Sequence, residues 1–185
     1  MRNKKIRNLV LIAMFAALTA VGAFIRVPTP WSSFTLQVLF VLLAGILLGP
    51  GPAAAAEAVY MVIGLLGVPI FTTGGGFASV LSPTFGFIIG FIPAAAVTGL
   101  ICGHSKTLWK LIVGCVAGLA VIYAIGLPYM AMILNGYLGK GMDFMQIMYA
   151  GMIPFLPYDA IKIVFCIALA IPLEKALEKA GLQTA

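Results

Sequence analysis

The sequence predicts an all-α integral membrane protein with six transmembrane helices and both termini in the cytoplasm. Of its 185 residues, 63% are hydrophobic and only 9% are charged, whereas charged residues make up about a quarter of a soluble protein. The mean hydropathy is +1.15, and the apolar residues form long runs. The length fits one membrane domain over residues 1–185.

The apolar runs are separated by glycine, proline and polar residues, which interrupt helices. A span needs about 20 apolar residues, and fewer where the helix ends are buried in protein. The string "LGPGPA" at residues 48–53 cannot continue a helix, because proline lacks a donor and glycine lowers helix propensity. It therefore predicts a tight hairpin between the second and third spans. The predicted spans are residues 8–25, 34–48, 52–66, 83–102, 108–134 and 154–173.

The first span follows a basic start and so resembles a secretory signal peptide. Its apolar run over residues 8–25 is longer than the about 7 to 15 residues of a signal core, and further spans follow. We therefore expect a retained first helix, with cleavage as the alternative.

The basic residues predict the orientation, because cytoplasmic loops are rich in lysine and arginine. With six spans, only Arg26 and Lys140 fall on the side opposite the termini. The basic residues as a whole are scattered along the sequence and form no stripe suited to nucleic acid. The basic residues on the side of the termini are Arg2, Lys4, Lys5, Arg7, Lys106, Lys110, Lys175 and Lys179.

The sequence offers no metal, redox or nucleotide motif. Cys102, Cys115 and Cys166 lie in apolar runs without a CxxC or Cys/His cluster, so we interpret them as packing residues. His104 is interpreted as an interfacial residue. No phosphate-binding GxxxxGK[ST] motif is present, so the chain cannot use ATP through such a loop.

Asp159 and Lys162 lie within the last apolar run. Their i, i+3 spacing places them on one helix face, and charges in membrane helices face the interior or a water-filled cavity. They could neutralise each other and tie helices together, or form the polar floor of a binding site. The second reading is favoured by Phe155 and Tyr158, which would lie at the same depth and supply apolar walls.

The segment over residues 67–87 is too apolar for a solvated loop and too rich in glycine for a helix. Such backbone occurs at membrane depth only where it lines a cavity or is buried in protein. Gln37 and Glu57 lie about one turn from the ends of their predicted helices, so we expect them to be solvated or to bond at the interface, with a role inside the bundle as the alternative. The binding candidates in the segment are Phe71, Gly74, Gly75, Gly76, Phe77 and Thr84.

Small residues recur along one face of the first span. Close helix approach depends on such faces, which could serve internal packing or a partner protein. The residues are Ala13, Ala16, Ala17 and Ala20.

Six strings together resemble the BioY family, the biotin-specific S components of energy-coupling-factor (ECF) vitamin transporters. They are "FAALTAVGAFIRVPTP", "FTLQVLFVLLAGILLGP", "GLLGVPIFTTGGG", "LSPTFGFIIGF", "GLPYMA" and "PFLPYDAIK". The resemblance implies a six-helix, vitamin-binding subunit in a prokaryotic plasma membrane. It also implies a separate transmembrane coupling subunit, a pair of cytoplasmic ATPases, and no cofactor.

Asp159 and Lys162 match the acid and base positions of that family. Its usual PTGGY and PFLPGD strings differ here at Phe85, Phe87 and Tyr158. An ionised aspartate only accepts hydrogen bonds and a lysine only donates them. Asp159 therefore suits a ureido N–H of biotin, and Lys162 suits the ureido oxygen or the carboxylate.

The remaining candidates would complete the site. The rings of Phe71, Phe77 and Tyr158 would wall the ligand, and the three glycines would let backbone groups approach it. The alanine face of the first helix would dock on the coupling subunit.

Three other functions stay open at this stage. The chain could be an S component for another small vitamin, or a structural subunit in which the pair has only an internal role. An intramembrane enzyme using Asp159 as an acid or base is disfavoured, because no partner nucleophile or metal site is found in the sequence.

Overall fold

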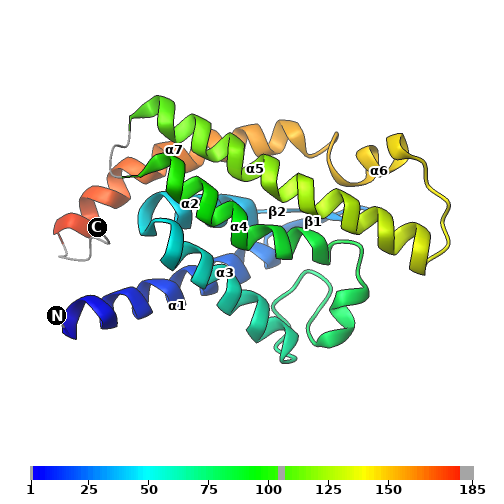
Figure 1. Cartoon of the computed structure of the whole chain (residues 1–185), viewed down its shortest axis with the longest axis horizontal. Coiled ribbons are helices and arrows are strands. Elements are labelled where there is room, and N and C mark those ends of the chain that lie inside the picture. Colours follow the sequence, from blue (N-terminus) through cyan, green and yellow to red (C-terminus); the bar gives the residue numbers. More distant parts are fainter. Residues whose placement is uncertain (1, 104–106, 180–185) are drawn as a thin grey trace.

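The computed structural model describes residues 2–103 and 107–179 and shows an elongated helical bundle (Figure 1). His104 and Lys106 lie outside these residues. Six helices of 12 or more residues occur in the described ranges, as predicted. They are α1 (Arg2–Phe24), α2 (Gln37–Leu48), α3 (Pro50–Leu65), α4 (Phe85–Cys102), α5 (Leu108–Ala131) and α7 (Leu156–Lys179).

Shorter elements that the sequence analysis did not predict lie between these helices. Strands β1 (Arg26–Pro28) and β2 (Ser33–Thr35) pair antiparallel, with Val27 opposite Phe34. A 3-10 turn, η1 (Phe77–Leu81), precedes α4. A π-helical turn, η2 (Met132–Tyr137), and the helix α6 (Phe144–Gly151) separate α5 from α7.

Three of the described helical segments are long and apolar enough to cross a membrane. They are Lys5–Phe24, Phe85–Cys102 and Leu108–Tyr137. Helix α2 is apolar but has only 12 residues. The number of helices therefore agrees with the sequence analysis, while a full crossing by each of the six stays a prediction.

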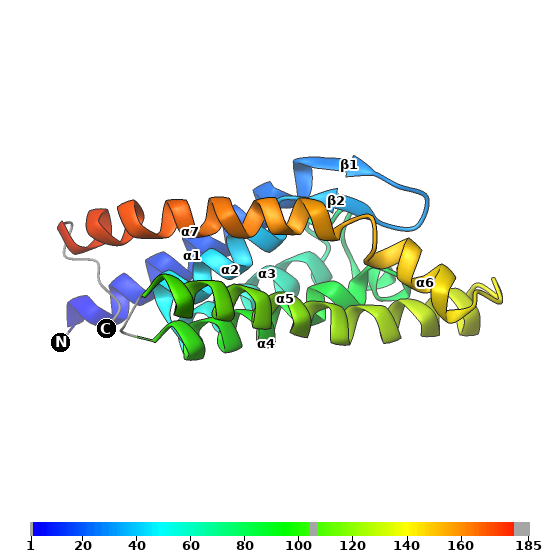
Figure 2. The same cartoon turned by 90° about the horizontal axis from the view of Figure 1, so that it is seen from above.

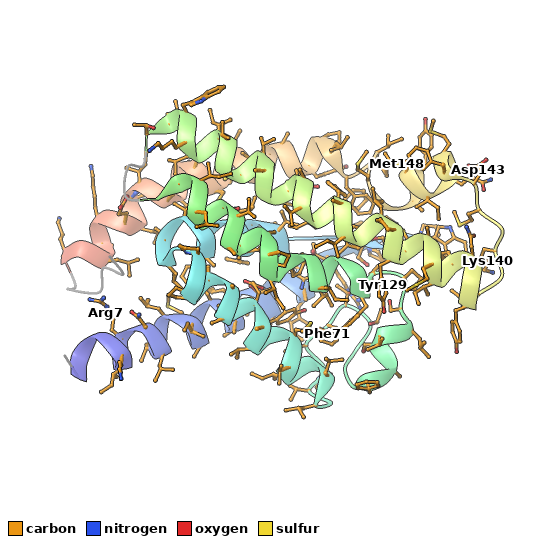
Figure 3. The ribbon with its side chains drawn as sticks, in the orientation of Figure 1. Arg7, Phe71, Tyr129, Lys140, Asp143 and Met148 are labelled. Atoms are coloured by element: carbon orange, nitrogen blue, oxygen red, sulfur yellow. The ribbon has the colours of Figure 1, made fainter. Side chains whose placement is uncertain are left out.

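The start of α1 and the end of α7 lie at the same end of the bundle, and the β hairpin and α6 lie toward the other (Figures 1 and 2). Arg7 and Lys140 are at opposite ends (Figure 3). This is the separation of basic residues that six consecutive spans require. The side of the membrane that each end faces stays a prediction.

The break between α2 and α3 has the predicted cause. Gly49 has a φ of 78°, a left-handed conformation that favours glycine. Pro50 then begins α3, where its missing N–H is not needed. The helix starts two residues before the predicted position, and the two helices form the expected hairpin.

Close packing of α4 against α5 depends on small residues. A Cβ on Gly118 would overlap the Thr98 hydroxyl, and one on Gly90 would lie 3.2 Å from the Cα of Ile122. Small residues at such contacts let helix backbones approach each other. The three cysteines are fully buried, in agreement with their interpretation as packing residues.

The glycine-rich segment is anchored to the bundle by Phe71, which is 3% exposed. Its ring packs edge-on against Tyr60, with the ring centroids 5.4 Å apart. A Cβ on Gly64 of α3 would overlap the same ring. The absence of a side chain at Gly64 is therefore what lets Phe71 enter the core.

We predict that Gly64→Ala destabilises the protein by about 1 to 3 kcal/mol, because the added methyl group overpacks the site of Phe71. Gly51→Ala is the matched control in the same helix, since a Cβ there meets nothing within 4 Å. Thermal unfolding of both variants in one detergent measures the difference. Equal unfolding temperatures would show that the Gly64–Phe71 contact does not limit stability.

Candidate functional site

A narrow cavity lies between α2, α4, α5 and α7, near the β hairpin and the glycine-rich segment. It contains about 620 Å³ that no protein atom fills, the solvent at its mouth included, but only about 70 Å³ is open to the centre of a water molecule. Its polar lining residues are Ser32, Ser33, Thr35, Gln37, Thr72, Thr84, Tyr123, Asp159 and Lys162, and its apolar ones include Val38, Phe87, Ile88, Phe91, Leu119, Ile122 and Phe155.

Asp159 and Lys162 form a buried ion pair in the wall of this cavity. The Lys162 Nζ atom donates to Asp159 Oδ1 at 2.8 Å, and the residues are 9% and 3% exposed. The Tyr123 hydroxyl of α5 donates to the other carboxylate oxygen, Oδ2. The pair lies within α7, so it is the bond from Tyr123 that joins two helices.

These bonds leave hydrogen-bonding capacity for a ligand. An ammonium group has three N–H donors and a carboxylate accepts about four hydrogen bonds. The bonds within the pair use one donor of Lys162, and Asp159 accepts one bond at each of its two oxygens. The site can therefore both donate to and accept from one bound molecule while its net charge stays zero.

Gln37 of α2 also lines the cavity and belongs to a second polar chain. Its Nε2 atom donates to the Tyr60 hydroxyl at 2.8 Å, and that hydroxyl donates to the Ile70 carbonyl at 3.1 Å. The chain links the cavity to the start of the glycine-rich segment. Gln37 is 4% exposed, so our expectation that it is solvated was wrong.

The same expectation was wrong for Glu57, which is fully buried. Its Oε1 atom accepts a hydrogen bond from Thr19 of α1 at 3.0 Å. It is not among the cavity's lining residues. Gln37 begins α2, where neighbouring parts of the bundle cover the helix end. Glu57 instead lies in the middle of α3 (Pro50–Leu65) and not about one turn from its end.

Hydroxyl groups gather at the end of the cavity formed by the loops. Ser32, Ser33 and Thr35 come from the β hairpin, and Thr72 comes from the glycine-rich segment. The Arg26 side chain donates to the Thr72 carbonyl. This bond ties the hairpin to the glycine-rich segment.

Of the predicted substrate-binding residues, Asp159, Lys162 and Thr84 line the cavity, and Phe155 lines it as well. The structure does not bring the others there. Phe71 lies in the core, while Phe77 and Tyr158 are 78% and 54% exposed.

The three glycines shape the segment without lining the cavity. Gly74 and Gly76 have φ values of 109° and 91°, and Gly74 pairs with Phe71 in a turn. A Cβ on Gly75 would overlap the Val68 carbonyl. The geometry of this turn therefore explains why glycine occurs at these positions.

The sequence analysis missed Tyr123 and the hydroxyls of the hairpin. Leu119, Ile122 and Tyr123 recur at intervals of three and four, which places them on one face of α5. That spacing was the available signal for a cavity-facing tyrosine. The hairpin residues have no comparable periodicity.

The predicted alanine face divides into two parts. Ala13 and Ala17 are exposed, whereas Ala16 is 5% exposed and Ala20 packs against the core.

In the described residues, no group of three or more His, Cys, Asp or Glu side chains could hold a metal ion.

Comparisons with known proteins agree with the resemblance found in the sequence. The "Probable biotin transporter BioY" of Lysinibacillus sphaericus is 44% identical over 172 residues, which cover 92% of this chain and 85% of that protein. The "Biotin transporter BioY" of Thermotoga maritima is 39% identical over 171 residues, covering 91% and 96% of the two chains.

A solved structure shares the fold. The crystal structure of the S-component for biotin from an ECF-type ABC transporter matches with a TM-score of 0.79 at 22% identity, over 95% of this chain and 94% of that one. A sequence model described as the BioY family matches residues 1–179. With the relatives above, this match shows that the chain belongs to the BioY family.

Proposed function

We propose that this chain is the biotin-binding S component of an ECF-type importer. It captures biotin outside the cell and delivers it to the cytoplasm with an ATPase-driven coupling module. The observation that carries the proposal is the Asp159–Lys162 pair in the wall of a narrow cavity, in a chain whose relatives are named biotin transporters. The chain is a transport subunit and not an enzyme.

The chemistry of the cavity suits biotin. Its ureido ring carries two N–H donors and one carbonyl acceptor, so Asp159 accepts from the ring and Lys162 donates to the ureido oxygen or to the carboxylate of the tail. Tyr123 holds the Asp159 carboxylate in position. Phe155, which the sequence analysis expected in the wall, supplies an apolar surface together with Phe87 and Phe91, which it did not name.

The proposed orientation follows from the positions of the charges. The ends of α1 and α7 face the cytoplasm with Lys5, Arg7 and Lys175, and the end carrying Lys140 faces outward. The protein crosses the plasma membrane several times. Its cavity then lies toward the outer end, where it can receive biotin.

The partners are a transmembrane coupling subunit and two cytoplasmic ATPases. Ala13 and Ala17 present small, exposed side chains on α1, which permit a second protein's helix to approach closely. Ala16 and Ala20 support the same helix from within the bundle.

We predict that Asp159→Asn weakens biotin binding at least about tenfold, because hydrogen bonds to a charged group contribute about 1.5 to 3 kcal/mol. Isothermal titration of the purified chain measures the affinity. Glu174→Gln is the matched control, since it makes the same change of charge on α7 and Glu174 does not line the cavity. Unchanged affinity in a folded Asp159→Asn variant would remove the aspartate from the binding site.

We predict that Ala17→Trp abolishes co-purification with the coupling subunit and leaves biotin binding intact, because Ala17 is exposed on α1 and distant in sequence from the cavity. Ala16→Trp is the contrasting variant, because overpacking a buried site costs about 1 to 3 kcal/mol of stability. Leu100→Trp, at another exposed helix position, controls for bulk. An Ala17→Trp variant that still assembles would contradict docking at this face.

A further inference from the structure

A second cavity, which we call the vestibule, is lined by residues of the β hairpin and of α6. These two elements lie toward the end of the bundle away from the termini (Figure 2). It contains about 1280 Å³ that no protein atom fills, open solvent included. The residues that matter below are Trp31 and Phe34 from the hairpin, Lys140 and Asp143 from the loop before α6, and Tyr149 and Phe155 from α6 and the turn after it.

The vestibule combines one cation with aromatic rings. The Lys140 Nζ atom lies 5.3 Å from the centroid of the Trp31 ring. Within residues 2–103 and 107–179, no ion pair of Lys140 with a carboxylate is found. An ammonium group beside aromatic rings can bind a carboxylate while the rings contact an apolar body.

The nearby carboxylate of Asp143 is already engaged. Its Oδ1 atom accepts from the Gln146 backbone N–H at 2.8 Å, and the Gln146 side chain accepts from the Asp143 backbone N–H at 2.9 Å. Asp143 therefore caps the start of α6, where the helix dipole favours a negative charge. Arg26 is a second exposed cation at this end of the bundle.

One aromatic pair separates the vestibule from the inner cavity. Phe155 lines both spaces, and its ring stacks on Phe34 with the centroids 4.2 Å apart. A molecule in the vestibule is thus separated from the Asp159 site by a stacked pair of rings. The two cavities therefore share Phe155 as a lining residue.

We infer that the vestibule is a first binding site for a carboxylate with an apolar body, and that Lys140 attracts its carboxylate before the molecule passes the Phe34–Phe155 pair. The inference rests on the proposed function, because the molecule is the transported biotin. It assigns Lys140 a role in the association rate, whereas the contacts of the inner site set the dissociation rate. Charges at the rim of a binding site act mainly on that rate.

The test is the association rate of biotin and of its uncharged primary amide, measured by stopped flow at low ionic strength. Lys140→Gln should slow association of biotin about two- to threefold, Lys140→Glu should slow it further, and neither should change the dissociation rate. The amide should associate equally fast with all three proteins. High salt should remove the difference between the proteins, because it screens exposed charges.

A matched control and a local reporter are present in the chain. Lys175→Gln and Lys175→Glu make the same charge changes at the opposite end of the bundle and should have no effect. The chain has two tryptophans, and Trp109 lies at the start of α5. In a Trp109→Phe background, fluorescence therefore reports on Trp31 in the vestibule.

The outcomes separate the two proposals. Equal association rates for biotin in wild type and both Lys140 variants would overturn the vestibule site while the proposed function stands. A change confined to the dissociation rate would also overturn it, since Lys140 would then act on the final complex. If wild type binds no biotin, the proposed function fails and the inference fails with it.

Discussion

The buried ion pair between Asp159 and Lys162 constrains how α7 packs against α5 and what the cavity beside it can bind. Moving two charges out of water costs several kcal/mol for each ion, and their attraction offsets this only with good geometry and further hydrogen bonds. Helix α7 supplies both charges at i, i+3, and α5 supplies the Tyr123 hydroxyl. The pair is neutral as a unit, yet it can still donate to and accept from a ligand. Both the stability of the buried pair and its binding of a ligand therefore depend on the geometry of these three side chains.

The loops that cover the cavity are held by packing in the core. Phe71 enters the bundle beside Gly64, and the next residue, Thr72, lines the cavity. Arg26 then joins the hairpin to the Thr72 carbonyl. A change at Gly64, far from any ligand contact, is thus expected to disturb the cavity through Phe71. The hairpin also contributes Phe34, whose ring stacks on Phe155 of the turn before α7, at the boundary between the inner cavity and the vestibule.

Helical periodicity explains which parts of the fold and site could be predicted from the sequence. The helix break at Gly49 and the shared face of Asp159 and Lys162 follow from local chemistry and from 3.6 residues per turn. Phe71 and Phe77 lie in a segment without a period, so their directions depend on the turn at Gly74 and on space beside Gly64. Gln37 was misjudged because its position along α2 does not reveal what packs over the helix end.

The most direct measurement is thermal unfolding of the purified chain in detergent, with and without biotin. At 100 times its dissociation constant, a ligand that binds only the folded state adds about 2.7 kcal/mol to the free energy of unfolding. The account predicts this gain for wild type and a smaller gain at the same biotin concentration for Tyr123→Phe, whose Asp159 carboxylate is no longer held from α5. Tyr137→Phe, at an exposed tyrosine, should behave as wild type. No stabilisation of wild type by biotin, or equal stabilisation of wild type and Tyr123→Phe, would contradict a site built on the pair and its tyrosine.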